Sequence, residues 1–283
     1  FQHGDRILNR ILDLNSEVNL NLDSLIKGNK NTGIVTVFSP QGGSGKTVIS
    51  YYLLQQFSAM GLKTFYLNLE TISSTKIVCG YADGEYGMSD IIYYLKDNKS
   101  NLPIKIEGIK SFNREMNASY LCPVNFPSDM EDFGEDDLKR LLLEFKTMGC
   151  FDVVLVDTES AINKRNMALL DASETVLLVV SMDAMSLHKL DVFNAGLKKR
   201  MQGSEREFYS KVVPVINRYA PNSEISPDDM RLDGKIINAR IPYLDDIYVR
   251  HGEKYDFNAA GNMGAYLAPV ARAIIRKHAE AAS

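Results

Sequence analysis

The chain has 283 residues, of which 45% are hydrophobic and 24% are charged, and its formal net charge at pH 7 is −4. These values exclude a disordered chain, a collagen-like repeat and a disulfide scaffold. The acidic balance provides no general attraction for nucleic acid or anionic lipid. No apolar run approaches the roughly 18 to 20 residues that a membrane-spanning helix needs.

The first 32 residues differ from the rest of the chain. Positions 7–14 have an amphipathic pattern that predicts a short helix, and the polar stretch ending at Thr32 predicts a linker. Because the first residue is Phe1 rather than Met, we expect the chain to begin inside a longer protein. We therefore divide the chain into a helix and linker at 1–32 and one large domain at 33–283.

From Gly33 onward, short apolar runs alternate with segments of helical periodicity. Continuous apolar strands separated by helices predict an α/β fold, with a mostly parallel twisted sheet covered by helices on both faces. Such sheets bind ligands at the carboxyl ends of their strands. The expected strands are 34–38, 64–69, 119–122, 152–156, 175–181 and 212–216, and the expected helices are 47–60, 88–97, 135–149 and 186–201.

The three cysteines are widely spaced and form no CxxC pair. We expect Cys79, Cys122 and Cys150 to be reduced, partly buried thiols of a cytoplasmic protein rather than disulfides or metal ligands.

A glycine-rich segment, SPQGGSGKT at 39–47, lies between the first expected strand and the first expected helix. Backbone N–H groups of such a loop converge on phosphate oxygens, and the helix N-terminus adds a favourable dipole. Lys46 would place its charge on the β and γ phosphates, and the Thr47 hydroxyl would bind Mg²⁺. A fortuitous glycine-rich turn is the alternative, but strand, glycines, Lys-Thr and helix occur in the order that the chemistry needs. The expected nucleotide contacts here are Gln41, Gly42, Gly43, Ser44, Gly45, Lys46, Thr47 and Val48.

The loop resembles the deviant Walker A loop, KGGxGKT, of the MinD/ParA family of P-loop ATPases, and further motifs extend the resemblance over roughly 33–280. Asn68-Leu-Glu70 follows the second strand, where the family has a DxD pattern. The fourth strand ends in Asp157-Thr158 as in the family. Asn217-Arg218 follows the VVPVI strand, and Ile241-Pro242 matches the family's Ile-Pro loop. The resemblance implies binding of ATP or ADP with Mg²⁺.

The resemblance also implies roles for single residues. Asp157 would hold the hydration shell of Mg²⁺, although an Asp at this place is also a common N-cap of the following helix. Glu70 would lie near the attacking water; it replaces an Asp, and Asn68 cannot act as a base. Asn217, followed by Arg218, would hydrogen-bond adenine, although Asn is a common loop residue. Pro242 would form a wall beside the base. The implied catalytic residues are therefore Lys46, Glu70 and Asp157, and the metal ligands are Thr47 and Asp157.

Gln41 is the departure with the largest consequence. The family has a Lys here that reaches across a nucleotide-sandwich dimer to the partner's phosphates. Gln41 has no charge, and a finger-type cation is worth on the order of 10³-fold or more in rate. We therefore expect slow hydrolysis, with ATP-dependent dimerisation retained.

Within the family, Gln41, the altered Asn-Leu-Glu segment and the leading linker look most like the CpaE/TadZ type, which localises pilus-assembly machinery. By this resemblance, residues 1–32 include the stub of a removed receiver-like domain. We expect a weak ATPase that dimerises with ATP and positions a protein assembly such as pilus or secretion machinery. It would be cytoplasmic, with recruitment to the cell pole or the inner membrane surface. Open alternatives are a phosphotransferase of the same fold, such as a bacterial tyrosine kinase, and a nucleotide-bound scaffold that does not hydrolyse.

Two segments suggest DNA or a membrane surface as other partners. The cations at 198–200 with Lys211 suggest a DNA-binding patch, but a solvated helix end fits the net acidity better. The final helix, at roughly 265–280, has basic residues beside apolar ones and would suit a membrane surface. Pro269 and the absence of aromatic residues after Tyr266 favour a packed terminal helix instead. We therefore expect neither nucleic-acid binding nor direct membrane insertion.

Overall fold

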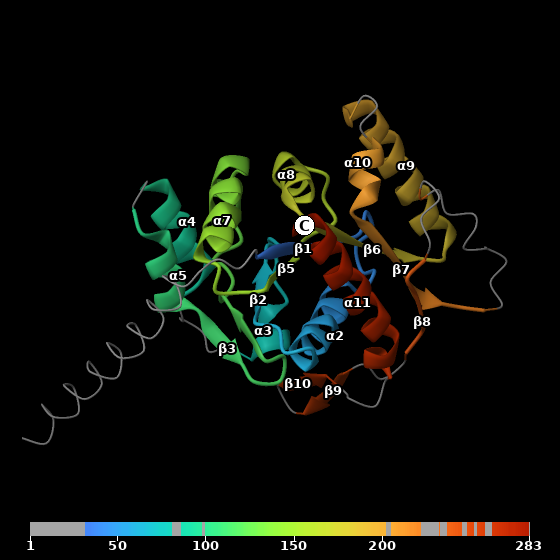
Figure 1. Ribbon diagram of the computed structural model, residues 1–283, viewed down its shortest axis with the longest axis horizontal. Coiled ribbons are helices and arrows are strands. Elements are labelled where there is room, and N and C mark those ends of the chain that lie inside the picture. Colours follow the sequence, from blue (N-terminus) through green and yellow to red (C-terminus); the bar gives the residue numbers. More distant parts are fainter. Residues whose placement is uncertain are drawn as a thin grey trace, which may run out of the picture.

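An eight-stranded sheet with the strand order β3-β4-β2-β5-β1-β6-β7-β8 forms the centre of the computed structural model (Figure 1). All neighbouring strands are parallel except β3, which is antiparallel to β4. The strands are β1 (Gly33–Phe38), β2 (Thr64–Asn68), β3 (Ser111–Asn113), β4 (Ala118–Tyr120), β5 (Val153–Asp157), β6 (Thr175–Ser181), β7 (Val212–Tyr219) and β8 (Ala239–Pro242). A separate antiparallel pair consists of β9 (Tyr248–His251) and β10 (Lys254–Phe257).

The structure describes residues 32–80, 86–97, 100–201, 205–221, 232, 237–244, 248–251, 254–257 and 262–282. The helix expected in the first 31 residues, and with it the predicted receiver stub, lies outside the described residues.

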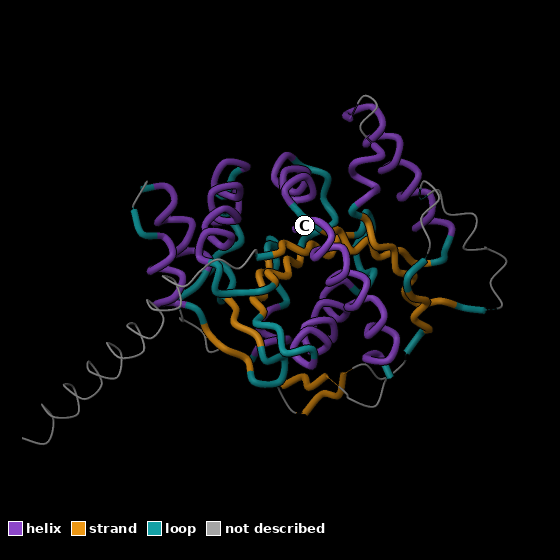
Figure 2. The backbone as a smooth tube through the Cα atoms, viewed as in Figure 1, coloured by secondary structure: helices purple, strands orange, loops and turns teal. Residues whose placement is uncertain are grey.

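Helices cover both faces of the sheet (Figures 1 and 2). On one face, α2 and α11 pack beside the short α3. The other face is covered by α4, α5, α7 and α8 over one half of the sheet and by α9 and α10 over the other half. The helices are α2 (Lys46–Ala59), α3 (Thr75–Cys79), α4 (Met88–Lys96), α5 (Leu102–Ile109), α6 (Asp129–Asp132), α7 (Glu135–Met148), α8 (Lys164–Ala172), α9 (Ala184–Met201), α10 (Glu205–Ser210) and α11 (Met263–Ala282).

Two-sided burial explains the continuous apolar strands. In β1, Val35 and Val37 point into the cluster under α2 and α11, whereas Ile34 points into the cluster under α4, α5 and α7. Because successive side chains of a strand point to opposite faces, each face needs apolar residues when both are covered. All six expected strands are confirmed, and so is the α/β class with a mostly parallel sheet.

The four expected helices are present with ends within two residues of the predicted ones. In α7 the local signals are clear, since three acidic residues occupy the first turn and the Gly149 backbone adopts the left-handed conformation at the C-cap. Among the described residues, sequence periodicity missed the short helices α3, α5, α6, α8 and α10, together with β3, β8 and the β9-β10 pair.

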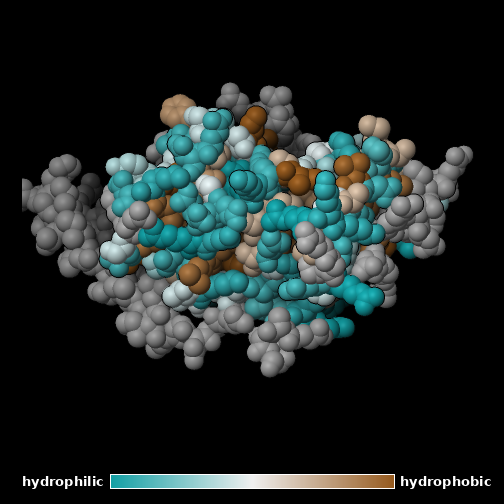
Figure 3. All heavy atoms as spheres, turned by 90° about the horizontal axis from the view of Figure 1, so that it is seen from above, coloured by the Kyte–Doolittle hydropathy of each residue, from teal (hydrophilic) through white to brown (hydrophobic). Residues whose placement is uncertain are grey.

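The terminal helix α11 packs against α2, as expected for a packed terminal helix. Leu267, Val270 and Ile274 are fully buried in the cluster that includes Leu53 and Phe57 of α2. Among the described residues, no helix is both long enough and apolar enough to cross a bilayer. On the face that Figure 3 shows, hydrophobic side chains form small separate groups among hydrophilic ones. The three cysteines carry free thiols, with Cys79 and Cys122 buried and Cys150 half-buried.

Candidate functional site

The loop from Ser39 to Gly45 joins the end of the central strand β1 to the start of α2. Neighbouring β5 and β6 lie on opposite sides of β1, and a crevice opens at such a reversal of strand order. Gly43 and Gly45 have φ angles of 70° and 92°, a region that other residues rarely adopt. This backbone turns the loop around the N-terminus of α2, where free N–H groups attract anions.

Asn217, two residues before the end of β7, holds the loop from the opposite side. Its Nδ2 donates a hydrogen bond of 2.7 Å to the Ser44 carbonyl oxygen. A Cβ at Gly45 would lie 2.3 Å from this Nδ2, whereas a Cβ at Gly43 would meet nothing within 4 Å. The backbone angle at 45 therefore favours glycine, and a side chain there would also displace the Asn217 amide from Ser44.

We expect Gly45→Ala to lower the free energy of unfolding by about 2–3 kcal/mol, because it adds displacement of the Asn217 amide, and loss of its hydrogen bond to Ser44, to an unfavourable φ. Gly43→Ala is the matched control, since it carries only the φ cost of about 1 kcal/mol. Urea unfolding of the two variants measures the difference. Equal losses would show that the contact between Gly45 and Asn217 does not constrain the loop.

The Lys46 side chain points from the first turn of α2 to the loop that follows β5. Its Nζ donates to Ser160 Oγ at 3.1 Å, and the residue is only 6% exposed. Among the described residues, the Ser160 hydroxyl is the one hydrogen-bond partner of this ammonium group, and the nearby Asp157 carboxyl interacts with it through charge. A nearly buried ammonium group with one neutral hydrogen-bond partner can still donate to an anion. Lys46 could therefore bind an anion at the carboxyl ends of β1 and β5.

Asp157 ends β5 directly beside the loop and is completely buried. Its Oδ2 accepts a hydrogen bond of 3.1 Å from the Tyr66 hydroxyl, whereas Oδ1 has no partner among the described residues. Burial and, second to it, the Glu70 charge raise the pKa of the Asp157 carboxyl to about 7, although Thr47, Lys46 and Tyr66 oppose the shift. The N-cap alternative for Asp157 is wrong, because Asn163 caps the next helix, accepting from the Asn166 N–H.

The segment after β2 is joined to the glycine-rich loop by hydrogen bonds. Asn68 Nδ2 and Ser74 Oγ donate to the Glu70 carboxylate at 3.3 and 3.2 Å, and Ser74 Oγ also lies 3.3 Å from Thr47 Oγ1. Glu70, Thr47 and Asp157 therefore face one space. Asn68 orients Glu70, although sequence reasoning gave Asn68 no role beyond its inability to act as a base.

The residues present fit a magnesium nucleotide. Asp157 Oδ1 and Ser44 Oγ are among the buried oxygen atoms that have no hydrogen-bond partner in the described part of the chain. No group of three or more His, Cys, Asp and Glu side chains that could hold a metal occurs in the described part of the chain. A magnesium ion held by Asp157 and Thr47 would therefore need phosphate and water oxygens as its remaining ligands, as is usual for this metal.

Of the predicted base contacts, the structure brings only Asn217 to the loop. Arg218 is exposed and has a φ of 57°, a strained angle for this residue. Pro242 ends the edge strand β8 opposite Tyr219, so it belongs to a strand rather than to the expected loop. The register between β7 and β8 is irregular from Ile216 to Tyr219, which places the irregular backbone beside Asn217.

No protein-family model matches the chain, and no curated protein matches its sequence. Solved structures do match its fold. The septum site-determining protein MinD from Pyrococcus horikoshii, complexed with Mg-ADP, is 22% identical with a TM-score of 0.57, covering 75% of this chain and 81% of that chain. A ParA family ATPase from Chlorobium tepidum is 17% identical with a TM-score of 0.61, covering 77% and 87%. A MinC:MinD cell division protein complex from Aquifex aeolicus matches at 17% identity with a TM-score of 0.59, covering 76% and 83%.

The fold is that of the MinD and ParA ATPases. Within this MinD/ParA fold, Gln41 occupies the loop position singled out by sequence. Its side-chain oxygen contacts Ser186 Oγ, which also contacts Asp183 Oδ2, and Ser186 lies in the first turn of α9. Burial raises the pKa of Asp183, but hydrogen bonds from Ser186 and Gln41 outweigh burial and hold it below its ordinary value. Gln41 is thus held inside its own chain beside an ionised carboxylate.

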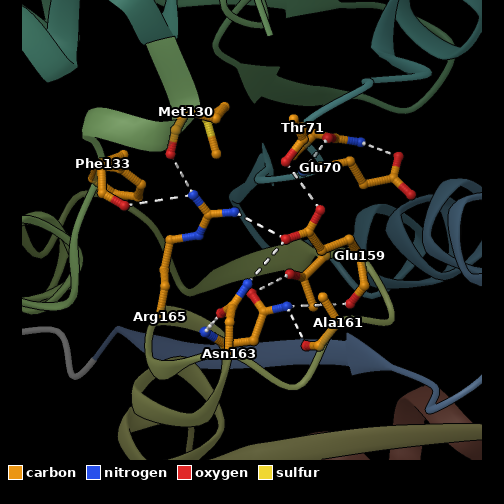
Figure 4. Close-up of polar contacts among 11 residues, drawn as sticks. Glu70, Thr71, Met130, Phe133, Glu159, Ala161, Asn163 and Arg165 are labelled. Carbon is orange, nitrogen blue, oxygen red and sulfur yellow. Dashed lines mark hydrogen bonds and ion pairs between the residues drawn. The ribbon is translucent and has the colours of Figure 1, made fainter. Parts of the chain in front are cut away.

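Sequence reasoning missed several residues of this MinD/ParA-fold site. Ser160 contacts Lys46, and Ser186 contacts both Gln41 and Asp183. In the segment after β5, Glu159 forms an ion pair with Arg165 (Figure 4). The one available signal was position, because the predicted strands at 152–156 and 175–181 place the segments that follow them at the ligand-binding edge.

Replacing the buried carboxylate should stabilise the protein in the absence of ligand. The folded-state pKa of Asp157 is about 7 against an ordinary 3.8, so between these values the folded state keeps a proton that the unfolded state releases. Wild-type stability therefore falls as pH rises through this range. We expect the gain from Asp157→Asn to grow from pH 4 to pH 7 and to reach about 2–4 kcal/mol.

Urea unfolding at several pH values measures this gain. Asp171→Asn is the control, because Asp171 lies in an exposed ion pair with Arg200. A gain that is independent of pH, or equal to that of the control, would contradict a strained carboxylate at position 157.

Proposed function

We propose that the chain is an ATP-binding, slowly hydrolysing switch that uses Mg²⁺ and forms a homodimer with ATP. The carrying observation is that the glycine-rich loop, Lys46 and Asp157 lie together at the carboxyl ends of β1 and β5, with the buried Asp157 Oδ1 lacking a partner among the described residues. The Mg-ADP in the structure of the Pyrococcus MinD supports the same ligand class for this fold.

In this proposal the backbone of 42–48 cradles the phosphates, and Lys46 neutralises their charge. The bound metal would supply charge stabilisation for phosphoryl transfer, with Thr47 and Asp157 as its protein ligands. Glu70 orients the attacking water, and Asn68 and Ser74 hold Glu70 in place. Asn217 and Pro242 border the base, with Arg218 at the rim. Asn217 would then have its side-chain oxygen and one amide hydrogen for adenine, because its other amide hydrogen is bonded to the Ser44 carbonyl.

The dimer is tested by sizing chromatography with light scattering, in the presence of ADP, ATP or a non-hydrolysable ATP analogue. We expect a monomer with ADP and a dimer with the analogue, and slow turnover should give a mixture with ATP. A monomer in every state would overturn the sandwich dimer. A dimer in every state would make the protein a constitutive scaffold.

We propose further that the ATP-bound dimer recruits a protein assembly, such as pilus or secretion machinery, at the cell pole or inner membrane surface. The CpaE/TadZ-like sequence features support this partner class, and the MinC:MinD complex is an example of a partner bound by the same fold. The net charge of −4 favours a protein partner over DNA. In cells, a fluorescent fusion should localise in the wild type and become diffuse in Lys46→Ala. Equal localisation of the two fusions would contradict recruitment by nucleotide.

Incubation with γ-labelled ATP separates the switch from a phosphotransferase. We expect free phosphate at a low rate and no labelled protein. Label on the chain or on an added substrate would show that the protein is a phosphotransferase and would contradict the switch.

A further inference from the structure

Arg165 of α8 connects the loop after β5 to helix α6. Its Nη1 donates to the carbonyl oxygens of Met130 and Phe133 at 2.7 and 3.5 Å, and its guanidinium lies 6.0 Å from the centre of the Phe133 ring. Figure 4 shows Arg165 reaching these carbonyls with one nitrogen while the other faces Glu159. The Arg165 side chain is only 10% exposed, so its contacts are protected from water.

Glu159 is the second member of the network. Its Oε1 accepts from Arg165 Nη2 at 3.1 Å and from Asn163 Nδ2 at 3.2 Å, and its Oε2 accepts from Thr71 Oγ1 at 3.0 Å (Figure 4). Thr71 adjoins Glu70 at the end of β2. One carboxylate therefore joins the loops after β2 and β5, and Arg165 extends the connection to α6.

The next residue along the chain, Ser160, contacts the proposed phosphate site through Lys46 at 3.1 Å. A phosphate group carries more negative charge than a hydroxyl oxygen, so a bound nucleotide would draw the Lys46 ammonium away from Ser160. Loss of that contact releases residue 160 while Glu159, one peptide bond away, is still held by Thr71 and Arg165. A nucleotide bound at the phosphate site would therefore act on Glu159 through the adjoining residue Ser160.

We propose that Glu159 and Arg165 are positioning residues that carry the state of the phosphate site to α6. This inference rests on the proposed nucleotide binding and adds a regulated element to it. The acidic segment around α6 then changes its dynamics with the bound nucleotide, and Thr71 couples the same change to Glu70.

Hydrogen–deuterium exchange of α6 tests the proposal, with Mg²⁺ and a non-hydrolysable ATP analogue as the probe. In the wild type we expect the exchange rates at 129–134 to change by at least about threefold when the analogue binds. Arg165→Lys keeps the charge but cannot reach Glu159 and both carbonyls at once, so the nucleotide-dependent change should disappear. Arg140→Lys is the matched control, because Arg140 donates to the Leu95 carbonyl at 3.4 Å in the neighbouring α4-α7 contact.

Thr71→Val supplies a second, milder variant that removes only the hydroxyl donor to Glu159. We expect it to weaken binding of the analogue roughly 3- to 10-fold, measured by calorimetry, with little change in thermal stability. A response in Arg165→Lys equal to that of the wild type would overturn the relay. So would a wild type that binds the analogue without any change at 129–134, or an unaltered affinity in Thr71→Val. A wild type that binds no nucleotide would overturn the proposed function, and the relay with it.

Discussion

Lys46→Ala is expected to weaken binding of ATP and of its non-hydrolysable analogue roughly 10- to 100-fold, the range that one charge-assisted hydrogen-bonding partner contributes. Lys46 is 6% exposed, and in the described part of the chain its ammonium donates to one neutral hydroxyl, so a phosphate could form a stronger hydrogen bond with it. Calorimetry on the folded variant gives the affinity directly. The affinity for AMP, which lacks the β and γ phosphates, should fall much less in this variant than the affinity for ATP.

Lys63→Ala is the control for this prediction. Lys63 is exposed and precedes β2. It therefore lies at the amino ends of the parallel strands, whereas the glycine-rich loop lies at their carboxyl ends. The control should bind ATP as the wild type does. If Lys46→Ala binds ATP with wild-type affinity, the crevice at the end of β1 is not a phosphate site.

The second large effect concerns the missing cation at position 41. Gln41→Lys alone should raise the hydrolysis rate by less than about tenfold, because the ionised Asp183 beside it would pair with the new ammonium. Gln41→Lys combined with Asp183→Asn removes that competitor. The double variant should gain on the order of 10³-fold in turnover, the value of a finger-type cation.

Turnover should be measured over a range of protein concentrations, because a cation that acts across a dimer gives a rate that rises with concentration. Asp183→Asn alone is the control and should leave the rate low. Were the double variant as slow as the wild type in a nucleotide-bound dimer, the neutral residue at position 41 would not be what limits hydrolysis.

The part of the fold that sequence predicted is the part with continuous burial. The strand at 175–181 is buried at every position, so its apolar run could be recognised from the sequence without knowledge of the neighbouring strands. The strand Ser111–Asn113 is different, because it is antiparallel at the sheet edge and only half-buried, and it has no apolar run. Strands of this kind are defined by their neighbours rather than by their own residues.

The same distinction applies to the site. The glycine-rich loop is local in sequence, so its order of strand, glycines, lysine and helix could be recognised. The contact of Gln41 with Ser186 joins residues 145 positions apart, and that of Lys46 with Ser160 joins residues 114 apart. No local pattern predicts such pairs, because they form only when the parallel sheet brings the ends of its strands to one edge.

Titration of the wild-type protein with ATP in an isothermal calorimeter, with and without Mg²⁺, tests the central claim most directly. We predict saturable binding at one site per chain with micromolar affinity, weakened when Mg²⁺ is withheld. Absence of saturable binding at millimolar ATP with Mg²⁺ would contradict the assignment of this crevice to a nucleotide.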